Sequence, residues 1–581
     1  MYIHVLQLII LATFLAGTSQ LSLPTDNTYH AGVVEYPDET GTPRERTTKA
    51  TEGFVAILES NATADLDILV FPESVLSNLE MATFVPHPAQ NITPCYSPDY
   101  ELFLVELSCA TRSRGIYVVI NVVEKELCGD NYGSDTLNPC PSAGFRYFNT
   151  NIVLDRSGRV VSRYRKSHLW RREYNTRATM RQPELAIFET DFGVTFGHFI
   201  CFDMLFYEPA MQLLLERNVT DIIYPTYWFS ELPFLGAVQL QEGWAYANNV
   251  NLLAADASQP SGRTSGSGIY AGRAGRLAAV IHEQPTLQLL KAHVPKRTPT
   301  TVGSGSGDGG RIPELPAQVV PAFEPQLVTP RYTELATYRD YNVDIFSTRL
   351  LEAEFQNVTQ RLCHGDFCCS FQLQRRPTSI SVSSTTTSYA SYRYRLGVYL
   401  GNRTALILVD RSELAVCALF ACLDEQLSSC GRIYPKHIDV ANRFYFERIR
   451  IEGNFPAAAR RLIMPSTLDG SMMPLSVAQF NWTESPPAKQ LLATQIQLEL
   501  LLPKNDLLTF GIWANYFTQL PSTHNLNHLQ PAAMPAPAAS APNASAGVPG
   551  VAGGAGGAGG AASAAVSILC LLPLLPLLLQ L

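Results

Sequence analysis

The chain has 581 residues, which is too many for one hydrophobic core, so its length predicts two domains of roughly 200–300 residues each. Hydrophobic residues make up 46% of the sequence and aromatic residues 10%, which is enough to fill two such cores. The formal net charge is −8 and no long run of Lys or Arg occurs, which excludes the basic surface that a nucleic-acid partner requires.

Residues 1–20 have the pattern of a secretory signal peptide. Residues 2–17 contain no charged side chain and are mostly apolar, and small residues follow at 17–19. Cleavage is therefore expected near position 19 or 20. The alternative is an uncleaved N-terminal anchor, which the shortness of the apolar run disfavours.

Residues 28–294 predict an α/β domain, because short apolar runs typical of buried strands alternate with segments of helical periodicity. The strand-like runs are 68–74, 115–125, 146–166, 193–203, 221–228 and 250–258, and the helix-like segments are 205–218 and 236–250. The tetrapeptide DRSG at 155–158 predicts a hairpin turn inside the third run.

Three chemically complementary residues stand at the ends of apolar runs in this region. Glu73 follows DILVFP, Lys166 ends SRYRK, and Cys201 lies between GVTFGHFI and a helix-like segment. A sharp turn from strand to helix would expose the thiol and direct the positive end of the helix toward it. Taken singly, each residue also fits an ordinary role: a surface Glu, a solvated basic strand edge with Arg163 and Arg165, and a buried structural cysteine.

Together, these three residues form a set suited to cleaving an amide. A cysteine thiolate is a strong nucleophile near neutral pH. A carboxylate can take the thiol proton and later give it to the leaving amine. A fixed cation can lower the thiol pKa and stabilise the oxyanion that develops on the attacked carbonyl. No His/Asp/Glu cluster has metal-ligand spacing, so the sequence predicts neither a metal nor another cofactor.

The sequence changes character after residue 294. Residues 295–329 are rich in Pro, Gly and Ser and predict a linker or a long surface loop. Residues 330–525 contain alternating β-branched and aromatic residues, as in ISVSSTTTSYASYRYRLGVYLG at 380–401. This composition predicts a second, β-rich domain.

The twelve cysteines indicate an oxidising compartment. Cys570 lies in the C-terminal tail and Cys201 must stay reduced to act as a nucleophile, which leaves a set of four and a set of six. The ten are Cys95, Cys109, Cys128 and Cys140, then Cys363, Cys368, Cys369, Cys417, Cys422 and Cys430. Both sets are even, so each domain can close its own disulfides, with the pairing left open. A zinc site in the second set is the alternative, but its adjacent cysteines do not match ligand spacing.

Asn-x-Ser/Thr triplets occur throughout the chain and predict N-glycosylation of a secreted protein. They begin at Asn61, Asn91, Asn218, Asn357, Asn402, Asn481 and Asn543. An unmodified surface loop is the alternative at any single site. Asn543 is the weakest candidate because it lies close to the C-terminal processing signal.

The C-terminal end has the pattern of a glycosylphosphatidylinositol (GPI) attachment signal. No charged residue follows Asp506, residues 526–563 predict a flexible Pro/Ala/Gly stalk, and residues 564–581 predict a hydrophobic tail that is removed. Two prolines interrupt the tail and no basic residue follows it, which disfavours a transmembrane helix. Asn543 or Ser545 is the expected attachment residue, and the mature protein is expected on the extracellular face of the cell membrane.

Several motifs resemble those of one enzyme family. The order Glu73, Lys166, Cys201 resembles the triad of the nitrilase/carbon–nitrogen hydrolase superfamily. The segments CFDMLFYEPA at 201–210, YPTYWFSELPFLGAVQLQEGWAYANNVNLLAADAS at 224–258 and GSGIYAGRAG at 266–275 resemble its vanin/biotinidase branch. The resemblance covers residues 28–525. It implies an α-β-β-α sandwich followed by a smaller β-rich domain with disulfides, in a glycosylated protein that is secreted or GPI-anchored.

The resemblance also implies a role for each site residue. Glu73 would be the general base, Cys201 would form a thioester with the substrate, and Lys166 would stabilise the tetrahedral intermediate. The backbone N–H of Phe202 would help to hold the oxyanion. Glu173, seven residues after Lys166, is expected to be a supporting carboxylate.

Two substrates are implied: pantetheine, cleaved to pantothenate and cysteamine, or a biotin amide such as biocytin. The GPI-type tail favours pantetheine. An aromatic cluster is expected to line the substrate pocket, with core packing as the alternative: Tyr224, Tyr227 and Trp228. A catalytically inactive surface receptor or adhesion protein is the rival of another class, and a papain-type protease is disfavoured because Cys201 lacks the CGSCW-like segment. The oligomeric state, monomer or dimer, stays open.

Overall fold

The structure, a computed structural model, describes residues 21–128, 140–180, 182–297, 335–354, 356–377, 390–403, 412–435, 438, 440–441, 444–485 and 493–517. The predicted signal peptide, stalk, hydrophobic tail and attachment residue lie outside the described residues, as does most of the predicted linker. In the part of the chain that is described, no helix has the length and apolar character needed to cross a membrane.

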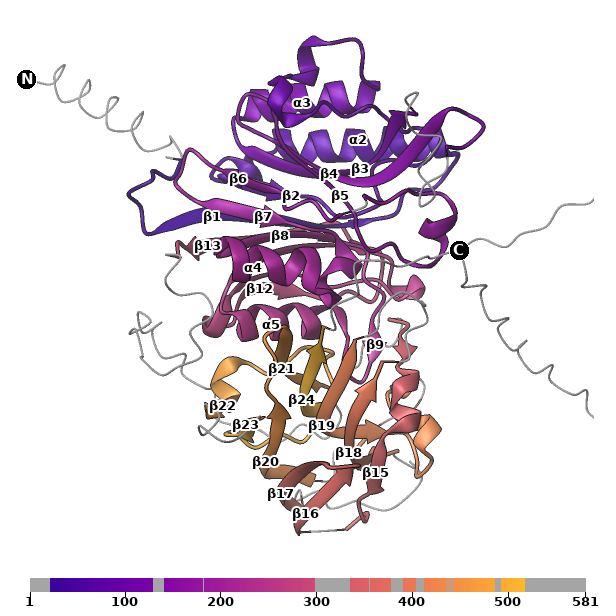
Figure 1. The fold of residues 1–581 in the computed structure, drawn as a ribbon, viewed down its shortest axis with the longest axis vertical. Coiled ribbons are helices and arrows are strands. Elements are labelled where there is room, and N and C mark those ends of the chain that lie inside the picture. Colours follow the sequence, from indigo (N-terminus) through magenta and orange to yellow (C-terminus); the bar gives the residue numbers. More distant parts are fainter. Residues whose placement is uncertain are drawn as a thin grey trace, which may run out of the picture. The chain divides into compact units, whose positions relative to one another are not determined.

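Twelve strands within residues 28–295 form two mixed sheets (Figure 1). The first has the order β13 (Gln288–Pro295), β1 (Thr28–Pro37), β2 (Ile68–Val70), β3 (Tyr117–Leu127), β4 (Phe145–Leu154), β5 (Val160–Arg165). The second has the order β12 (Arg276–Val280), β11 (Ser267–Ala271), β10 (Asn251–Ser258), β8 (Asp221–Thr226), β7 (Thr195–His198), β6 (Ile187–Glu189). A short parallel contact joins β1 to β10.

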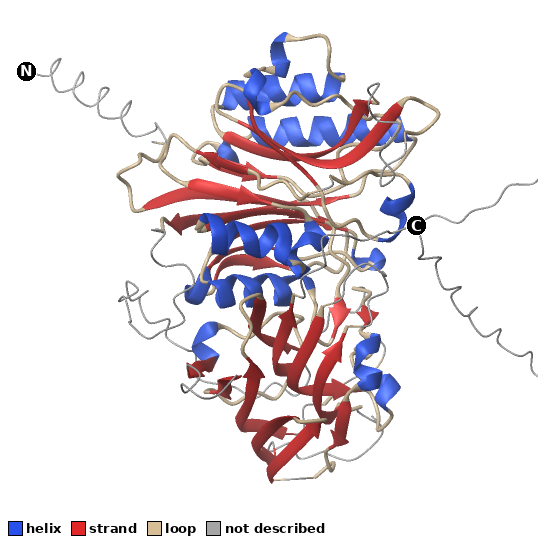
Figure 2. Cartoon of the chain, in the orientation of Figure 1, coloured by secondary structure: helices blue, strands red, loops and turns tan. Residues whose placement is uncertain are grey.

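A hydrophobic core separates the two sheets, and helices cover their outer faces (Figure 2). Helices α2 (Pro43–Glu59) and α3 (Leu102–Arg114) pack on the first sheet, and α4 (Gln212–Arg217) and α5 (Ala237–Asn248) pack on the second. Helix α2 begins at a capping box, in which the side chains of Thr42 and Glu45 accept hydrogen bonds from free backbone N–H groups. The layers confirm the predicted α-β-β-α sandwich.

The C-terminal region contains two five-stranded antiparallel sheets. One has the order β15 (Ser347–Leu350), β18 (Arg393–Asn402), β19 (Glu413–Cys422), β24 (Leu507–Tyr516), β21 (Arg461–Asp469), and the other has β16 (Asn357–His364), β17 (Phe367–Pro377), β20 (Phe444–Pro456), β23 (Ala493–Leu500), β22 (Phe480–Ser485). Side chains of β17 alternate between buried and exposed, as a sheet with one face on a core requires. The strand-rich second region is thus confirmed.

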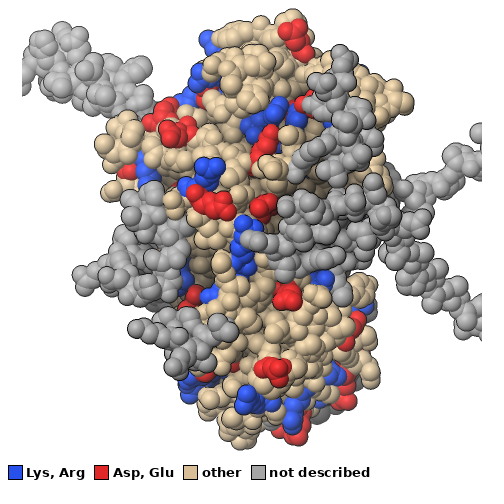
Figure 3. Space-filling model, viewed as in Figure 1, with Lys and Arg blue, Asp and Glu red and all other residues tan. Residues whose placement is uncertain are grey.

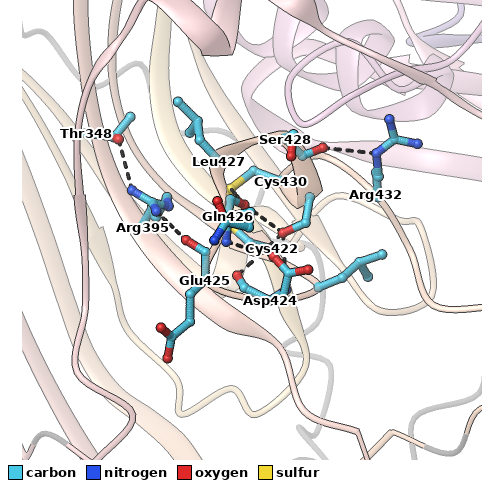
Figure 4. The surroundings of a disulfide bond; sticks show 12 residues. Thr348, Arg395, Cys422, Asp424, Glu425, Gln426, Leu427, Ser428, Cys430 and Arg432 are labelled. Carbon is cyan, nitrogen blue, oxygen red and sulfur yellow. Dashed lines mark hydrogen bonds between the residues drawn. A yellow bond between two sulfur atoms is a disulfide. The ribbon is translucent and has the colours of Figure 1, made fainter. Parts of the chain in front are cut away.

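The ten paired cysteines of the prediction all form disulfides within their own region. The pairs are Cys95–Cys109, Cys128–Cys140, Cys363–Cys368, Cys369–Cys417 and Cys422–Cys430. The zinc alternative for the second set is wrong, because its six sulfur atoms form three disulfides. The last pair closes a loop whose backbone carbonyls accept hydrogen bonds from arginines, including Arg395 and Arg432 (Figure 4).

Buried hydrogen bonds connect the C-terminal region to the N-terminal α/β domain. The side chain of Gln239 in α5 donates to Ser466 Oγ in β21 at 2.9 Å. The side-chain amide of Asn515 in β24 donates to the carbonyl of Leu205 at 2.9 Å. Leu205 ends the short helix that begins at Cys201, so the C-terminal region supports the segment that carries the predicted nucleophile.

Candidate active site

The three predicted catalytic residues all lie just beyond the C-terminal ends of strands. Glu73 follows β2, Lys166 immediately follows β5, and Cys201 follows β7. Their side chains are buried, with exposed fractions of 2% for Glu73, 1% for Lys166 and 6% for Cys201. The structure brings all three together.

Tyr227 links the nucleophile to the base. Its backbone N–H donates to Oε2 of Glu73 at 2.9 Å, and its carbonyl accepts the thiol of Cys201 at a sulfur–oxygen distance of 3.7 Å. The charges of Glu73 and Lys166 both act on the thiol. The backbone of Tyr227 therefore contacts both the sulfur and the carboxylate.

The ammonium of Lys166 lies between two carboxylates. Its Nζ donates to Oε1 of Glu73 at 2.7 Å and to Oε2 of Glu173 at 2.9 Å. Glu173 lies in the turn after Lys166 and also accepts the backbone N–H of Trp170 at 2.7 Å. The predicted supporting carboxylate is thus in direct contact with the predicted cation.

A ladder of asparagine amides, which was not predicted from the sequence, connects the carboxylates to the first sheet. Nδ2 of Asn149 lies 2.7 Å from both Glu73 Oε1 and Glu173 Oε1. Its Oδ1 accepts from Asn121 at 2.7 Å, and Asn121 also donates to Asn151 at 3.0 Å. The available signal was the occurrence of polar amides inside strands that are otherwise apolar.

Cys201 sits in a sharp turn, as predicted, but the turn does not lead into a long helix. Its backbone has φ of 46°, a left-handed conformation that costs a non-glycine residue about 1 kcal/mol or more. A five-residue 3₁₀ helix, Cys201–Leu205, begins at this residue, a π-helical turn spans Tyr207–Met211, and the α-helix begins only at Gln212. The helix expected over 205–218 is therefore present only in its later part, because Glu208 has extended backbone angles.

The first turn of this 3₁₀ helix contains the predicted oxyanion donor. Phe202 is its second residue, and N–H groups at the start of a helix have no acceptor within the helix. Asp203 stabilises the turn by accepting the N–H of Ile200 at 3.1 Å and the hydroxyl of Tyr164 at 2.7 Å. Phe202 stays the predicted oxyanion donor, directly after the nucleophile in the chain.

The electrostatics of the cluster favour a protonated thiol at rest. Burial and the negative charge of Glu73 raise the pKa of Cys201 well above its usual value, and the opposing effect of Lys166 is smaller. The expected lowering of the thiol pKa by a cation is therefore outweighed. Burial and the charge of Glu173 also raise the pKa of Glu73, against the effect of Lys166. A carboxylate with a raised pKa is a better proton acceptor, which suits a general base.

Lys166 and Glu173 keep their charges. Burial would lower the pKa of Lys166, but the carboxylates of Glu173 and Glu73 outweigh it and raise the pKa well above its usual value. Burial would raise the pKa of Glu173, but Lys166 and Asn149 outweigh it and lower the pKa. The ammonium and the second carboxylate therefore form a stable charged pair, and Glu73 is the group free to exchange a proton.

A pocket opens beside the sulfur. Half of its lining residues are aromatic, namely Trp170, Phe202, Tyr227, Trp228 and Phe229. Tyr224 does not line this pocket, contrary to expectation: it is fully buried, and its hydroxyl donates to the carbonyl of Cys201 at 2.8 Å. Within the residues that the structure describes, no group of three or more His, Cys, Asp or Glu side chains is arranged to bind a metal.

Comparisons with known proteins agree with this architecture. Residues 43–294 match the family model of carbon-nitrogen hydrolases, and residues 335–520 match the model of the vanin C-terminal domain. Vanin-like protein 1 of Drosophila melanogaster is 40% identical over 524 residues, which cover 88% of this chain and 89% of the relative. The biotinidase of Takifugu rubripes is 31% identical, covering 70% and 77%, and the pantetheinase of Canis lupus familiaris is 30% identical, covering 65% and 68%. The chain therefore belongs to the vanin/biotinidase branch of the nitrilase/carbon–nitrogen hydrolase superfamily, and it is an amide-cleaving hydrolase.

Proposed function

We propose that this protein hydrolyses pantetheine to pantothenate and cysteamine through a thioester on Cys201. The observation that carries the proposed chemistry is a thiol that lines an aromatic pocket and shares Tyr227 as a backbone partner with a carboxylate, which in turn binds an ammonium. The relatives named pantetheinase support this substrate. Hydrolysis of a biotin amide such as biocytin is the second candidate, supported by the relative named biotinidase.

In the first half of the proposed reaction, Glu73 takes the proton of Cys201 as the sulfur attacks the amide carbonyl. The carbonyl oxygen becomes an oxyanion, which the ammonium of Lys166 and the N–H of Phe202 stabilise. Glu73 then returns the proton to the leaving nitrogen, the carbon–nitrogen bond breaks, and the amine departs. The acyl group remains on the sulfur as a thioester.

In the second half, water replaces the amine. Glu73, ionised again, takes a proton from water as the water oxygen attacks the thioester carbonyl. The same two donors stabilise the second oxyanion. The carbon–sulfur bond breaks, the carboxylic acid departs, and the proton held by Glu73 returns to the sulfur of Cys201. Glu173 and Asn149 do not touch the reacting atoms and act as positioning residues for Lys166 and Glu73.

The proposed location is the extracellular face of the cell membrane, with a GPI anchor at Asn543 or Ser545. Two observations support an extracellular protein. The first is the set of five disulfides, which persist in oxidising compartments. The second is the exposure of every described sequon asparagine, namely Asn61, Asn91, Asn218, Asn357, Asn402 and Asn481.

The proposed function is tested by comparing kcat/KM of the purified, glycosylated ectodomain on pantetheine and on biocytin. We expect a higher kcat/KM for pantetheine. A higher value for biocytin would replace the substrate assignment and leave the thioester chemistry intact. An amide-derived electrophile should add its mass to Cys201, and a sulfur that stays unmodified in the wild-type protein would favour the inactive-receptor alternative.

A further inference from the structure

Two charged side chains line the substrate pocket together with Cys201. They are Glu231, in the short strand β9 (Glu231–Leu232), and Arg403, which follows β18 in the C-terminal region. Cys201 lines the same pocket. The pocket is therefore lined by residues of both regions of the chain, and its lining is incomplete without Arg403 of the C-terminal region.

Both side chains have unused hydrogen-bonding capacity. Within the described part of the chain, neither the carboxylate of Glu231 nor the guanidinium of Arg403 has a hydrogen-bond or ion-pair partner, and they do not pair with each other. Burial and, second, the charge of Asp340 raise the pKa of Glu231 to about 7. The positive charge of Arg403 attracts the carboxylate and so acts in the opposite direction, lowering this pKa. A buried or half-buried charged group without a partner is costly unless a ligand supplies one.

The neighbouring charges are already engaged. Arg171 also attracts Glu231, but its guanidinium donates to the hydroxyl of Tyr338 at 3.2 Å. Asp340 accepts the backbone N–H of Asn342 at 2.8 Å and its side-chain amide at 2.7 Å. Glu231 and Arg403 are thus the groups with capacity left over for a ligand.

The backbone holds both residues in place. The N–H of Glu231 donates to the carbonyl of Leu235 at 3.1 Å, and β9 pairs with β14 (Tyr338–Arg339). The N–H of Arg403 donates to the carbonyl of Ser412 at 2.9 Å. Residues fixed in this way lose little freedom when they bind a substrate, which favours selectivity.

The face of the molecule drawn in Figure 3 offers less basis for selecting a substrate. On the face drawn in Figure 3, the described basic and acidic side chains are interspersed, and no extended area carries one sign. Such a face does not attract a charged substrate from a distance. Local groups in the pocket are therefore better placed to choose among amides.

We propose that Glu231 and Arg403 bind the polar groups of the substrate that lie away from the scissile carbonyl, and that they determine specificity. Glu231 accepts a hydrogen bond from a hydroxyl or amide N–H, and Arg403 donates to a hydroxyl or carbonyl oxygen. Because the pair offers both an acceptor and a donor, it suits an amide without net charge that offers both donors and acceptors. This inference rests on the proposed amide hydrolysis and specifies the substrate class of that same site.

Pantetheine has this chemistry, since it carries hydroxyls and a second amide in addition to the bond that is cleaved. A short aliphatic amide such as butyramide lacks all of these groups. Sites that form hydrogen bonds to a substrate discriminate strongly against analogues without the polar groups, because the site's own groups are then left unpaired.

The test measures kcat and KM of Glu231→Gln and Arg403→Gln on pantetheine, biocytin and butyramide. Each change should reduce kcat/KM on the preferred polar substrate by about 10- to 100-fold, mostly through KM, because one charge-assisted hydrogen bond is lost. On butyramide, kcat/KM should stay within about twofold of wild type. The matched controls are Glu52→Gln and Arg349→Gln, at exposed positions outside the pocket, and they should leave all three substrates unaffected.

Several outcomes would overturn the inference. They are an equal loss on all three substrates, no loss on any, or a wild-type enzyme that prefers butyramide to both polar amides. A wild-type enzyme that cleaves biocytin and not pantetheine refutes only the pantetheine assignment, and the same variants then test the pair on biocytin. Calorimetric binding of pantetheine and biocytin to Cys201→Ala, with and without Arg403→Gln, gives a readout independent of turnover, and we expect the second change to weaken binding.

Discussion

Lys166 Nζ lies 2.7 Å from Glu73 Oε1, although the two residues are 93 positions apart in the chain. The same ammonium binds Glu173, so one buried cation serves two carboxylates and the cluster has a net negative charge. A thiolate would add a second negative charge to this cluster, which explains why the thiol is protonated at rest. Proton transfer to Glu73 therefore accompanies the attack on the substrate, and the negative charge moves directly onto the substrate oxygen.

Cys201→Ala and Glu73→Gln should each abolish hydrolysis of pantetheine while leaving the fold intact. Cys201→Ala removes the atom that forms the thioester. Glu73→Gln keeps a side chain of the same shape, which can still accept the N–H of Tyr227, but it cannot take the thiol proton. We expect a loss of about 100- to 10,000-fold for Glu73→Gln. Steady-state kinetics and thermal unfolding test this, and full activity in either variant with an unchanged melting temperature would refute the triad.

Glu173→Gln should lower kcat more than it changes KM. The neutral amide leaves Lys166 with one carboxylate, so the ammonium shifts toward Glu73 and away from the oxyanion. We expect a drop in kcat of about 10- to 100-fold, equivalent to the loss of one charge-assisted contact. Glu189→Gln, at an exposed position on β6, is the matched control. A loss confined to KM would contradict the positioning role.

Asn149→Leu should destabilise the protein and reduce activity together. The amide bridges Glu73 and Glu173, and the apolar replacement leaves buried carboxylate oxygens with fewer donors. The free energy of unfolding should fall by about 1–3 kcal/mol. Denaturant titration measures this, with the exposed Asn27→Leu as control. Wild-type stability in Asn149→Leu would show that the asparagine ladder has no supporting role.

The buried imidazole of His198 should make the protein less stable in acid. Burial lowers its pKa to about 3, whereas an unfolded chain has a histidine pKa of about 6.5. Between these values the unfolded state binds a proton that the folded state does not, so stability decreases as pH falls from about 6.5 toward 3, by up to about 1.4 kcal/mol per pH unit.

His198→Asn tests this contribution, because asparagine stays neutral and still offers a polar group to Ser162, whose hydroxyl lies 2.7 Å from the ring. Packing loss should lower the stability of the variant at every pH, but the slope of unfolding free energy against pH should be shallower in acid than for wild type. Above pH 7 the two slopes should coincide. Identical slopes throughout the acid range would mean that His198 does not cause the effect.

A phosphatidylinositol-specific phospholipase should release the protein from intact cells, because the anchor is expected to be its link to the membrane. Immunoblotting of the medium measures release. A glycosidase that removes N-linked glycans should also reduce its apparent mass, given the exposed sequons at Asn61, Asn91, Asn218, Asn357, Asn402 and Asn481. A protein that stays with the cells after phospholipase treatment would contradict the GPI anchor.

Local pattern alone predicted much of this protein. Apolar runs ending at Glu73, Lys166 and Cys201 indicated strands whose C-terminal ends carry chemistry, and the strands β2, β5 and β7 end just before them. The DRSG segment predicted the turn between β4 and β5, and the even cysteine sets predicted disulfides within each region. These features depend on neighbours in the chain or on simple counts, which a sequence displays directly.

The tertiary structure decided what depends on distant contacts. It brings the amide of Asn149 into contact with both Glu73 and Glu173. It also brings the hydroxyl of Tyr224 to the carbonyl of Cys201, and it places Arg403 of the C-terminal region in the pocket wall. It also decides the protonation of Cys201, because burial and the charges of residues far away in the chain set the pKa of a thiol. The periodicity of a sequence indicates only which face of a helix or strand is buried. The side chains that contact this face, and the pKa shifts that they cause, become defined only when the sheets pack.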